Sequence, residues 1–240
     1  MLRIETVRET GSTNADLLTR IAVGDHLAEG LWLVADRQHA GRGRHGRSWL
    51  DGPGNFMGST VIHLTPHDPA PAALSLVAAL AVYEAVLPRL SDPHRLQIKW
   101  PNDLLLGGDK MAGILLERAG NSAVLGVGVN LAVAPALPDR RAGHLATLGP
   151  APDRDAFAHD LAARFDHELA RWRQFGMEPV IARWLAAAHP PGAPLSVHGA
   201  DGSRLSGTFE GLAADGALRL RLADGTIRII HAGDVALERS

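Results

Sequence analysis

The chain contains no cysteine, and this absence excludes disulfides, cysteine zinc ligands and thiol nucleophiles. Aromatic residues make up only 5% of it and its formal net charge is −2, so the composition as a whole does not favour nucleic acid. No uninterrupted apolar run reaches the roughly 18 residues of a membrane helix. The first five residues lack the basic stretch and apolar run of a signal peptide. We expect a cytoplasmic protein without a membrane segment.

What remains is an ordinary globular composition, 46% hydrophobic and 21% charged over 240 residues. This length suits a main domain with a small second one. The stiff segment His189 to Pro194 separates a helix-rich part from a part with short strands and Asp-Gly turns. We therefore expect a larger domain at residues 1–189 and a small domain at residues 190–240.

The larger part mixes strand-like and helix-like patterns, which predicts an α+β fold with a sheet backed by helices. Ser12 suits a helix N-cap and Gly24 the matching C-cap. The Gly- and Arg-rich segment between the strands expected at residues 31–35 and 56–64 is predicted to form a basic loop. The expected strands cover residues 2–7, 31–35, 56–64, 97–106, 111–117 and 123–131, the last three as a central meander, and the expected helices cover residues 12–24, 72–87, 157–172 and 180–188.

The small part reads as an antiparallel barrel. The pairs Asp201-Gly202, Asp215-Gly216 and Asp224-Gly225 each suit a tight hairpin turn. Between the last two pairs, leucines alternate with arginines from Leu218 to Leu222, as in a strand with one buried face.

The segment Gly41-Arg42-Gly43-Arg44-His45-Gly46-Arg47, called the Arg-Gly loop below, predicts an anion site. Its glycines let the backbone approach a ligand, and its arginines supply forked donors for carboxylate or phosphate. By itself, however, the segment also fits a flexible solvated loop or an RNA-binding patch.

Two residues flank this loop. Gln38 carries both donors and an acceptor and could recognise a neutral polar group, although a surface glutamine is the plainer interpretation. Trp49 could seal the loop over a ring system, but packing in the core is favoured.

The segment Lys99-Trp100-Pro101-Asn102-Asp103 turns polar in the middle of an apolar strand, where charged groups are unfavourable without a partner. Because Pro101 interrupts a strand ladder, we expect a bulge that redirects these side chains toward a site. An edge strand with solvated charges is the alternative. Lys110, just after a Gly-Gly-Asp turn, could reach a carboxylate or phosphoryl oxygen.

Gly126 and Gly128 lie on one face of a buried strand, where ligand approach and tight packing explain them equally well. The 12 histidines show no metal-ligand spacing, so we expect no structural metal.

Together these motifs resemble the biotin protein ligases in order and in spacing. The resemblance rests on Ser12-Thr13-Asn14, Gln38 with the Arg-Gly loop and Ser48-Trp49, Lys99 to Asp103, Lys110-Met111-Ala112-Gly113-Ile114-Leu115, and Gly126 to Asn130. It covers nearly the whole chain. It implies a mixed sheet backed by helices, like that of class II aminoacyl-tRNA synthetases, followed by a C-terminal SH3-like β-barrel.

The resemblance also implies roles for the residues at matching positions. Lys110 and Arg44 are implied to be catalytic, with Lys110 bridging the reacting carboxylate and the α-phosphate. The implied biotin-binding residues are Ser12, Thr13, Asn14, Gln38, Arg42, Gly43, Arg44, Lys110, Gly113 and Gly128. The implied ATP-binding residues are Arg44, Arg47, Trp49, Lys99, Asn102, Asp103 and Asn130, with Mg²⁺ near Asp103.

The implied activity is ATP-dependent formation of biotinyl-5′-AMP and transfer of biotin to a lysine of a biotin carboxyl carrier protein domain. The resemblance allows a homodimer. The Ser-Thr-Asn motif begins at Ser12, so we expect no N-terminal winged helix and no DNA binding. The register of Arg239 against a family arginine that reaches ATP stays open, as do the general base and the role of the barrel.

Two other functions stay open on the residues. A lipoate or octanoate ligase of related fold is the nearer alternative, although octanoyl transferases use a cysteine and lipoate ligases lack the Arg-Gly loop. An RNA-binding module that uses this loop and the barrel is the other, and the net charge of −2 argues against it.

Overall fold

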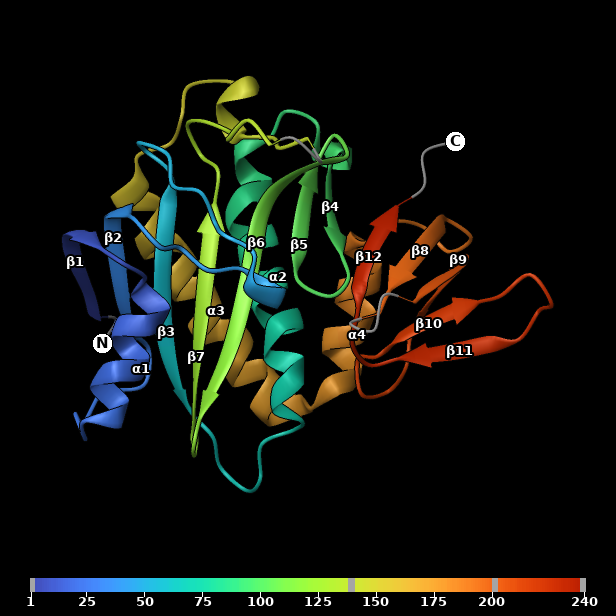
Figure 1. Cartoon of the computed structure of the whole chain (residues 1–240), viewed down its shortest axis with the longest axis horizontal. Helices are drawn as coiled ribbons and strands as arrows, with labels where there is room; N and C mark the ends of the chain where they lie inside the picture. Colours follow the sequence, from blue (N-terminus) through green and yellow to red (C-terminus); the bar gives the residue numbers. More distant parts are fainter. Residues whose placement is uncertain (1–2, 138–140, 200–202, 238–240) are drawn as a thin grey trace.

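The computed structural model describes residues 3–137, 141–199 and 203–237, arranged as two sheets with four α-helices (Figure 1). The larger sheet has seven strands in the order β1-β2-β3-β7-β6-β5-β4, and the smaller has five in the order β11-β10-β9-β8-β12. The strands are β1 Arg3–Thr10, β2 Leu31–Gln38, β3 Phe56–His63, β4 Leu96–Lys99, β5 Asp103–Leu106, β6 Asp109–Ala119, β7 Ser122–Val129, β8 Pro194–His198, β9 Arg204–Leu212, β10 Leu218–Arg221, β11 Ile227–Ile230 and β12 Asp234–Leu237. The helices are α1 Thr13–Ala22, α2 Leu74–Val86, α3 Arg154–Phe175 and α4 Met177–Ala187.

The larger sheet is mixed, as predicted, because β1 and β2 are parallel while its other neighbours are antiparallel. Its two faces carry different cores. Along β3, Val61 packs with Leu17 of α1 on one face, whereas Ile62 joins the large core under α2 and α3 on the other. This alternation follows from the two-residue period of a strand. Since α1 covers only part of its face, the area over β7 and β6 stays open for the loop that crosses it (Figure 1).

The first helix confirms its predicted caps to within a residue. The Ser12 hydroxyl accepts from the Ala15 backbone N–H at 3.5 Å, and the helix runs Thr13–Ala22. Gly24, just beyond the C-cap Val23, has a φ of +86°, a left-handed conformation that glycine adopts without strain. The strand before it is longer than predicted and ends at Thr10, while Leu2 of the prediction lies outside the described residues.

Helix α2 is the central core helix. With its flanking turns it spans Pro71–Arg89 and is long and apolar enough, by length and composition, to cross a membrane. In this fold 61% of its most apolar window is buried, against α3, α4 and the sheet. Burial on several sides explains a helix that is hydrophobic nearly all round.

The prediction of one strand over residues 97–106 is wrong, although its second half, β5, begins the predicted meander with β6 and β7. The chain reverses there, so that β4 and β5 form a hairpin with Lys99 opposite Asp103, and β4 is the edge of the sheet. Pro101 lacks the N–H that a strand ladder needs, and the backbone turns instead of bulging. The turn brings both charged ends of the motif together.

The smaller sheet is antiparallel throughout and has the predicted turns. Gly216 and Gly225 follow their aspartates with φ values of +87° and +83°. In β10, Leu218 and Leu220 are buried while the intervening arginine is not, as the alternation predicted. The third turn, Asp201-Gly202, lies outside the described residues, and the boundary at 189/190 stays a prediction.

His189 lies buried where α4 leads toward the smaller sheet, with its ring 4.3 Å from the ring of Phe209. Neither ring nitrogen has a hydrogen-bond partner among the described residues. Burial, helped by the positive charge of Lys99, lowers the pKa of His189 to about 4. The folded protein therefore holds a neutral imidazole that an unfolded chain would protonate near its ordinary pKa of 6.5.

We expect the free energy of unfolding to fall as the pH is lowered from about 6.5 to about 4, since the unfolded chain binds the proton first. The loss is at most about 3.4 kcal/mol, the value of 2.5 pKa units. Urea denaturation across this range should show a weaker pH dependence in His189→Phe, whereas His26→Gln, at an exposed position, should keep the wild-type profile. Identical profiles for His189→Phe and the wild type would contradict the assignment.

Candidate functional site

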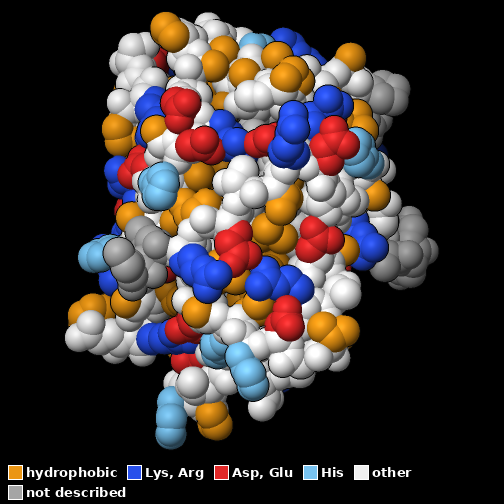
Figure 2. All heavy atoms as spheres, turned by 90° about the vertical axis from the view of Figure 1, so that its left-hand side faces the viewer, with side chains coloured by type: hydrophobic (Ala, Val, Ile, Leu, Met, Phe, Trp, Pro, Cys, Tyr) orange, Lys and Arg blue, Asp and Glu red, His pale blue; other side chains and the backbone are white. Residues whose placement is uncertain are grey.

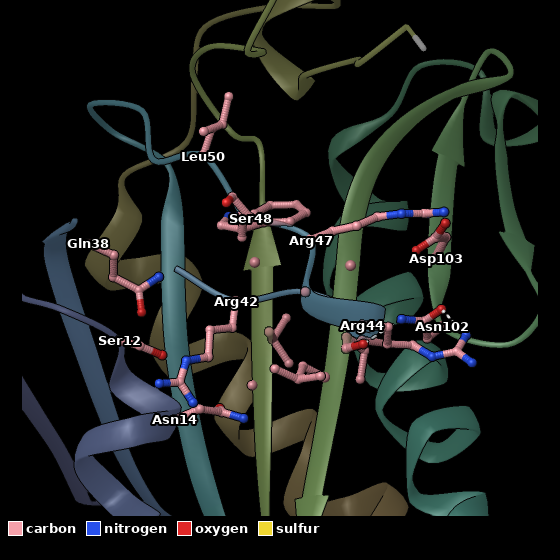
Figure 3. A pocket seen from close by; sticks show the side chains of 18 of the residues that line it. Ser12, Asn14, Gln38, Arg42, Arg44, Arg47, Ser48, Leu50, Asn102 and Asp103 are labelled. Atoms are coloured by element: carbon pink, nitrogen blue, oxygen red, sulfur yellow. Dashed lines mark hydrogen bonds between the residues drawn. The ribbon is translucent and has the colours of Figure 1, made fainter. Parts of the chain in front are cut away.

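One pocket lies on the open face of the larger sheet, between the first turn of α1, the Arg-Gly loop and the β4–β5 hairpin (Figure 3). It gathers residues from positions 12 to 234 of the chain. The predicted site residues in its lining are Ser12, Thr13, Asn14, Gln38, Arg42, Gly43, Arg44, Arg47, Trp49, Asn102, Asp103, Lys110, Gly113, Gly128 and Asn130. Lys99 stands behind this lining and contacts Asp103.

The Arg-Gly loop folds back on itself. The Gly43 N–H donates to the Arg47 carbonyl at 2.7 Å, around a short turn at Arg44–Gly46. The Trp49 N–H closes the base of the loop on the Gly41 carbonyl at 2.9 Å. A side chain at Gly41 would bring a Cβ within 2.5 Å of the Trp49 carbonyl, so this closure requires glycine there.

Trp49 packs against the floor of the pocket, where β6 and β7 present glycines. A Cβ at Gly128 would lie 2.3 Å from the indole ring, and one at Gly113 would lie 3.0 Å from it. A Cβ at Gly126 would lie 2.3 Å from the Asn14 Oδ1. Close packing by these side chains therefore accounts for both glycines of β7, and Trp49 is at once a packing residue and part of the pocket wall.

At the other side of the floor, Asp103 binds two ammonium groups. Its carboxylate lies 2.6 Å from the Lys110 Nζ and 3.1 Å from the Lys99 Nζ, and these are the only two lysines of the sequence. Burial acts to raise the pKa of Asp103, but the charges of Lys110 and then Lys99 outweigh it and hold the pKa below the usual value. The Lys110 Nζ also lies 5.9 Å from the centre of the Trp49 ring.

Two arginines of the loop reach the smaller sheet. Arg44 donates to the Asn102 Oδ1 and to the Gly233 carbonyl, both at 3.2 Å, and Arg47 forms an ion pair with Asp234. Burial lowers the pKa of Arg44, against the opposing charges of Asp234 and Asp103. The Lys99 Nζ donates to the carbonyl of Val235, the residue after Asp234, at 2.9 Å. The start of β12 is thus part of the site.

Asn102 and Asn130 hold the backbone of the pocket with their amides. Asn102 donates to the Ile114 carbonyl at 2.6 Å, and Asn130 donates to the Gly143 carbonyl at 3.1 Å. Both are buried, and their side chains brace strands that carry other pocket residues.

The end of the pocket beside α1 is polar, and the Arg42 side chain extends toward Ser12 and Asn14 there (Figure 3). The Thr13 backbone N–H donates to the Gln38 Oε1 at 2.8 Å, and Asn14 accepts from the Ser59 hydroxyl at 2.5 Å. Ser59 and Asp234 are pocket residues that sequence reasoning missed. Ser59 sits in an unremarkable strand, and Asp234 comes from the other sheet, so neither has a local signal.

The described residues do not form a protein-held Mg²⁺ site. They contain no group of three or more carboxylates or histidines suited to a metal, and both oxygens of Asp103 face ammonium groups. The expected placement of Mg²⁺ near Asp103 therefore lacks a free ligand on that side chain.

Residues 11–133 match the Biotin/lipoate A/B protein ligase family, and residues 197–237 match the Biotin protein ligase C terminal domain. The biotin–[acetyl-CoA-carboxylase] ligase of Paracoccus denitrificans is 39% identical over 237 residues, covering 94% of this chain and 97% of the relative. That of Mycobacterium tuberculosis is 37% identical, covering 97% and 88%. The biotin protein ligase of Aquifex aeolicus in complex with biotin and ATP superposes over 100% of both chains with a TM-score of 0.86 and 26% identity.

Proposed function

This chain belongs to the biotin/lipoate A/B protein ligase family, and we propose that it is a biotin protein ligase, which activates biotin with ATP and transfers it to a lysine of acetyl-CoA carboxylase. The observation that carries the proposal is the polarity of one pocket. Polar side chains of α1 and β2 line the end beside α1 together with Arg42, and Arg44, Arg47 and Lys110 line the other. A ligand with a neutral polar ring and a carboxylate tail matches this arrangement.

In the first step an oxygen of the biotin carboxylate attacks the α-phosphorus of ATP. A new P–O bond forms, the bond to the β-phosphate breaks, and pyrophosphate leaves. Two anions must approach each other, so the step depends on cations that are already in place. Lys110, held by Asp103, and Arg44, held by Asn102, are fixed in position for this task. Positioning of this kind lowers the barrier because no reorganisation is needed during reaction.

In the second step the amine of the acceptor lysine attacks the acyl carbon, the C–O bond to AMP breaks, and the lysine nitrogen loses a proton. Water hydrolyses a mixed anhydride that it can reach. The Arg-Gly loop lies across the pocket and keeps water away from the anhydride until the lysine attacks. The acceptor is the biotin carboxyl carrier domain of the carboxylase.

We assign biotin to the side of the pocket lined by Ser12, Thr13, Asn14, Gln38, Arg42, Gly43, Gly113 and Gly128, and ATP to the side lined by Arg47, Trp49, Asn102, Asp103 and Asn130, with Lys99 behind it. Arg44 and Lys110 stand between the two sides, where the substrates react. Mg²⁺ enters as the counter-ion of ATP. We also propose a cytoplasmic enzyme that does not bind DNA and that can form a homodimer.

ATP-dependent transfer of labelled biotin to a purified carrier domain tests the function directly. The expected result is one biotin on one lysine, with release of AMP and pyrophosphate. Transfer of lipoate or octanoate in place of biotin would support the related ligases instead.

RNA binding without ATP use is the other alternative. Figure 2 shows one face of the molecule, on the side of β1 and α1, with Lys and Arg side chains interspersed with Asp and Glu. In the pocket Lys110 and Arg47 are paired with carboxylates, and so is Lys99 behind it. Neither arrangement is the continuous basic surface that tracks a nucleic-acid backbone.

We expect Arg44→Ala to weaken retention of the adenylate more than its formation. The side chain makes two charged hydrogen bonds that hold the loop against the hairpin and the smaller sheet, and it lines the pocket. We expect biotinyl-adenylate to be released about 10 to 100 times faster than from the wild type. Filter binding of labelled biotin measures this release rate. Arg228→Ala, at an exposed position on β11, serves as the control, and an unchanged release rate in Arg44→Ala would refute the role.

A further inference from the structure

Asn55 is a buried side chain just before β3, and its amide binds the chain that leaves β7. Its Oδ1 accepts from the backbone N–H groups of Ala132 at 3.0 Å and Val133 at 3.2 Å. Its Nδ2 donates to the Val133 carbonyl at 2.9 Å and to the Asn130 Oδ1 at 3.4 Å. A side-chain amide has two donor hydrogens and two acceptor lone pairs, so all of its capacity is used here. Because backbone N–H groups can only donate, the amide has no other orientation in this place.

This amide continues the ladder between β3 and β7 beyond its last pair. Phe56, the first residue of β3, pairs with Val129, the last residue of β7. Past that pair, the Asn55 side chain binds both the N–H and the carbonyl of Val133, as a neighbouring strand would. Residues 131–137 belong to no helix or strand, so side-chain contacts of this kind have a large part in fixing their position.

The turn before Asn55 is shaped to fit the same segment. The Asn55 N–H donates to the Gly52 carbonyl at 3.1 Å. A Cβ at Gly52 would lie 2.5 Å from a methyl carbon of Val133 and 2.8 Å from the Asn55 Nδ2, and one at Gly54 would lie 3.0 Å from the Ala132 Cβ. The turn therefore packs directly against residues 132 and 133, and glycine at position 52 leaves the room that the amide needs.

Residues 131–137, called the outer wall below, bound the pocket at the end away from α1. Strand β7 leads from the α1 end of the pocket, where it packs against Asn14, to Asn130 on the proposed ATP side. The outer wall continues from there, and its Pro135 and Leu137 line the pocket. The bonds to Asn55 hold this wall only a few residues before its two lining side chains.

We propose that Asn55 is a positioning residue for the nucleotide, whose amide holds the outer wall in place before ATP arrives. The proposal rests on the function proposed above. Asn55 lies outside the pocket lining, so it acts through the backbone of Ala132 and Val133 and through Asn130. Without the amide, two N–H groups and a carbonyl would need water as their partner, and the wall would move outward to reach it. ATP would then bind only in the fraction of time in which the wall is in place, and its apparent affinity would fall by that fraction.

Asn55→Leu tests this because leucine has nearly the same shape and none of the hydrogen bonds. In biotin-dependent pyrophosphate exchange we expect the KM for ATP to rise about tenfold, the effect of leaving buried polar groups unpaired. The KM for biotin should stay within about twofold, and kcat should be nearly unchanged because saturating ATP restores the wall. Asn121→Leu, the same substitution at an exposed position between β6 and β7, is the matched control.

Hydrogen–deuterium exchange separates positioning from a general structural role. In the ligand-free wild type the amide hydrogens of Ala132 and Val133 should exchange slowly, since both are bonded to Asn55. In Asn55→Leu they should exchange about ten times faster, while the strands of the larger sheet keep their protection. ATP together with biotin should restore slow exchange in the variant, because the nucleotide binds the protein only with its wall in place, whereas biotin alone should not.

Gly52→Ala reaches the same bonds by another route and keeps the proposal testable if Asn55→Leu fails to fold. The new Cβ would displace Val133 or the Asn55 amide, without removing a hydrogen-bonding group. The KM for ATP should rise in this variant as well, again with little change in the KM for biotin.

An unchanged KM for ATP in the folded variants would overturn the proposal. Equal rises in the KM for ATP and for biotin, with a lower melting temperature, would also overturn it, because they mark general loosening of the pocket. Failure of the proposed function looks different. A wild-type enzyme that activates lipoate and not biotin would reveal it before any variant is compared, and hydrogen–deuterium exchange of the ligand-free protein would still report whether Asn55 holds the outer wall.

Discussion

Lys110→Ala should lose nearly all biotin-dependent exchange of pyrophosphate into ATP, by about 100- to 1000-fold, the cost of removing one fixed group that stabilises transition-state charge. Lys110 lines the pocket between the two proposed substrate sides, and Asp103 holds its ammonium at 2.6 Å. The loss should appear in kcat as well as in kcat/KM, because the ammonium is needed most when carboxylate and α-phosphate meet. Exchange of labelled pyrophosphate measures this step without an acceptor protein.

Lys110→Arg is the informative companion, since it keeps the charge but replaces a compact ammonium with a planar fork. Partial recovery is expected. Arg8→Ala, at an exposed position on β1, controls for the loss of a cation elsewhere. Full biotin-dependent exchange in Lys110→Ala would remove this residue from the chemistry.

The parts of the fold that could be predicted from sequence are those with a local cause. Ser12 caps its helix through its own side chain, and the Asp-Gly pairs at 215 and 224 form turns through their own backbone preferences. The Arg-Gly loop was recognisable because glycines and arginines alternate over seven residues, whatever lies around them. Local patterns of this kind survive in any tertiary context.

The parts that could not be predicted depend on contacts between distant residues. The motif at Lys99 to Asp103 showed that the strand is interrupted, but whether it bulges or reverses is decided by pairing with β6 and by the ammonium of Lys110. Asp234 meets Arg47 across almost 190 positions, a separation from which no sequence pattern connects them.

Asp103→Ala should be the most destabilising of these substitutions. The substitution leaves the partly buried ammonium groups of Lys99 and Lys110 with no carboxylate between them. Removing one partner of a buried ion pair costs about 3 to 5 kcal/mol, because the other charge stays buried without compensation. At neutral pH the variant should show the whole of this loss in its free energy of unfolding relative to the wild type. The folded-state pKa of Asp103 is lowered, so its contribution is present above the unfolded pKa of about 3.9 and is lost as the pH falls through the lower folded value.

Urea denaturation of the wild type and Asp103→Ala at several pH values tests both statements. Adding Lys99→Met and Lys110→Met to Asp103→Leu should recover much of the lost stability without activity, because replacing a whole buried ionic group with apolar residues removes the uncompensated charges. A single Asp103→Ala variant as stable as the wild type at neutral pH would mean that water already solvates the two lysines. The cations would then be flexible, and the argument that they are fixed before the substrates meet would fail with it.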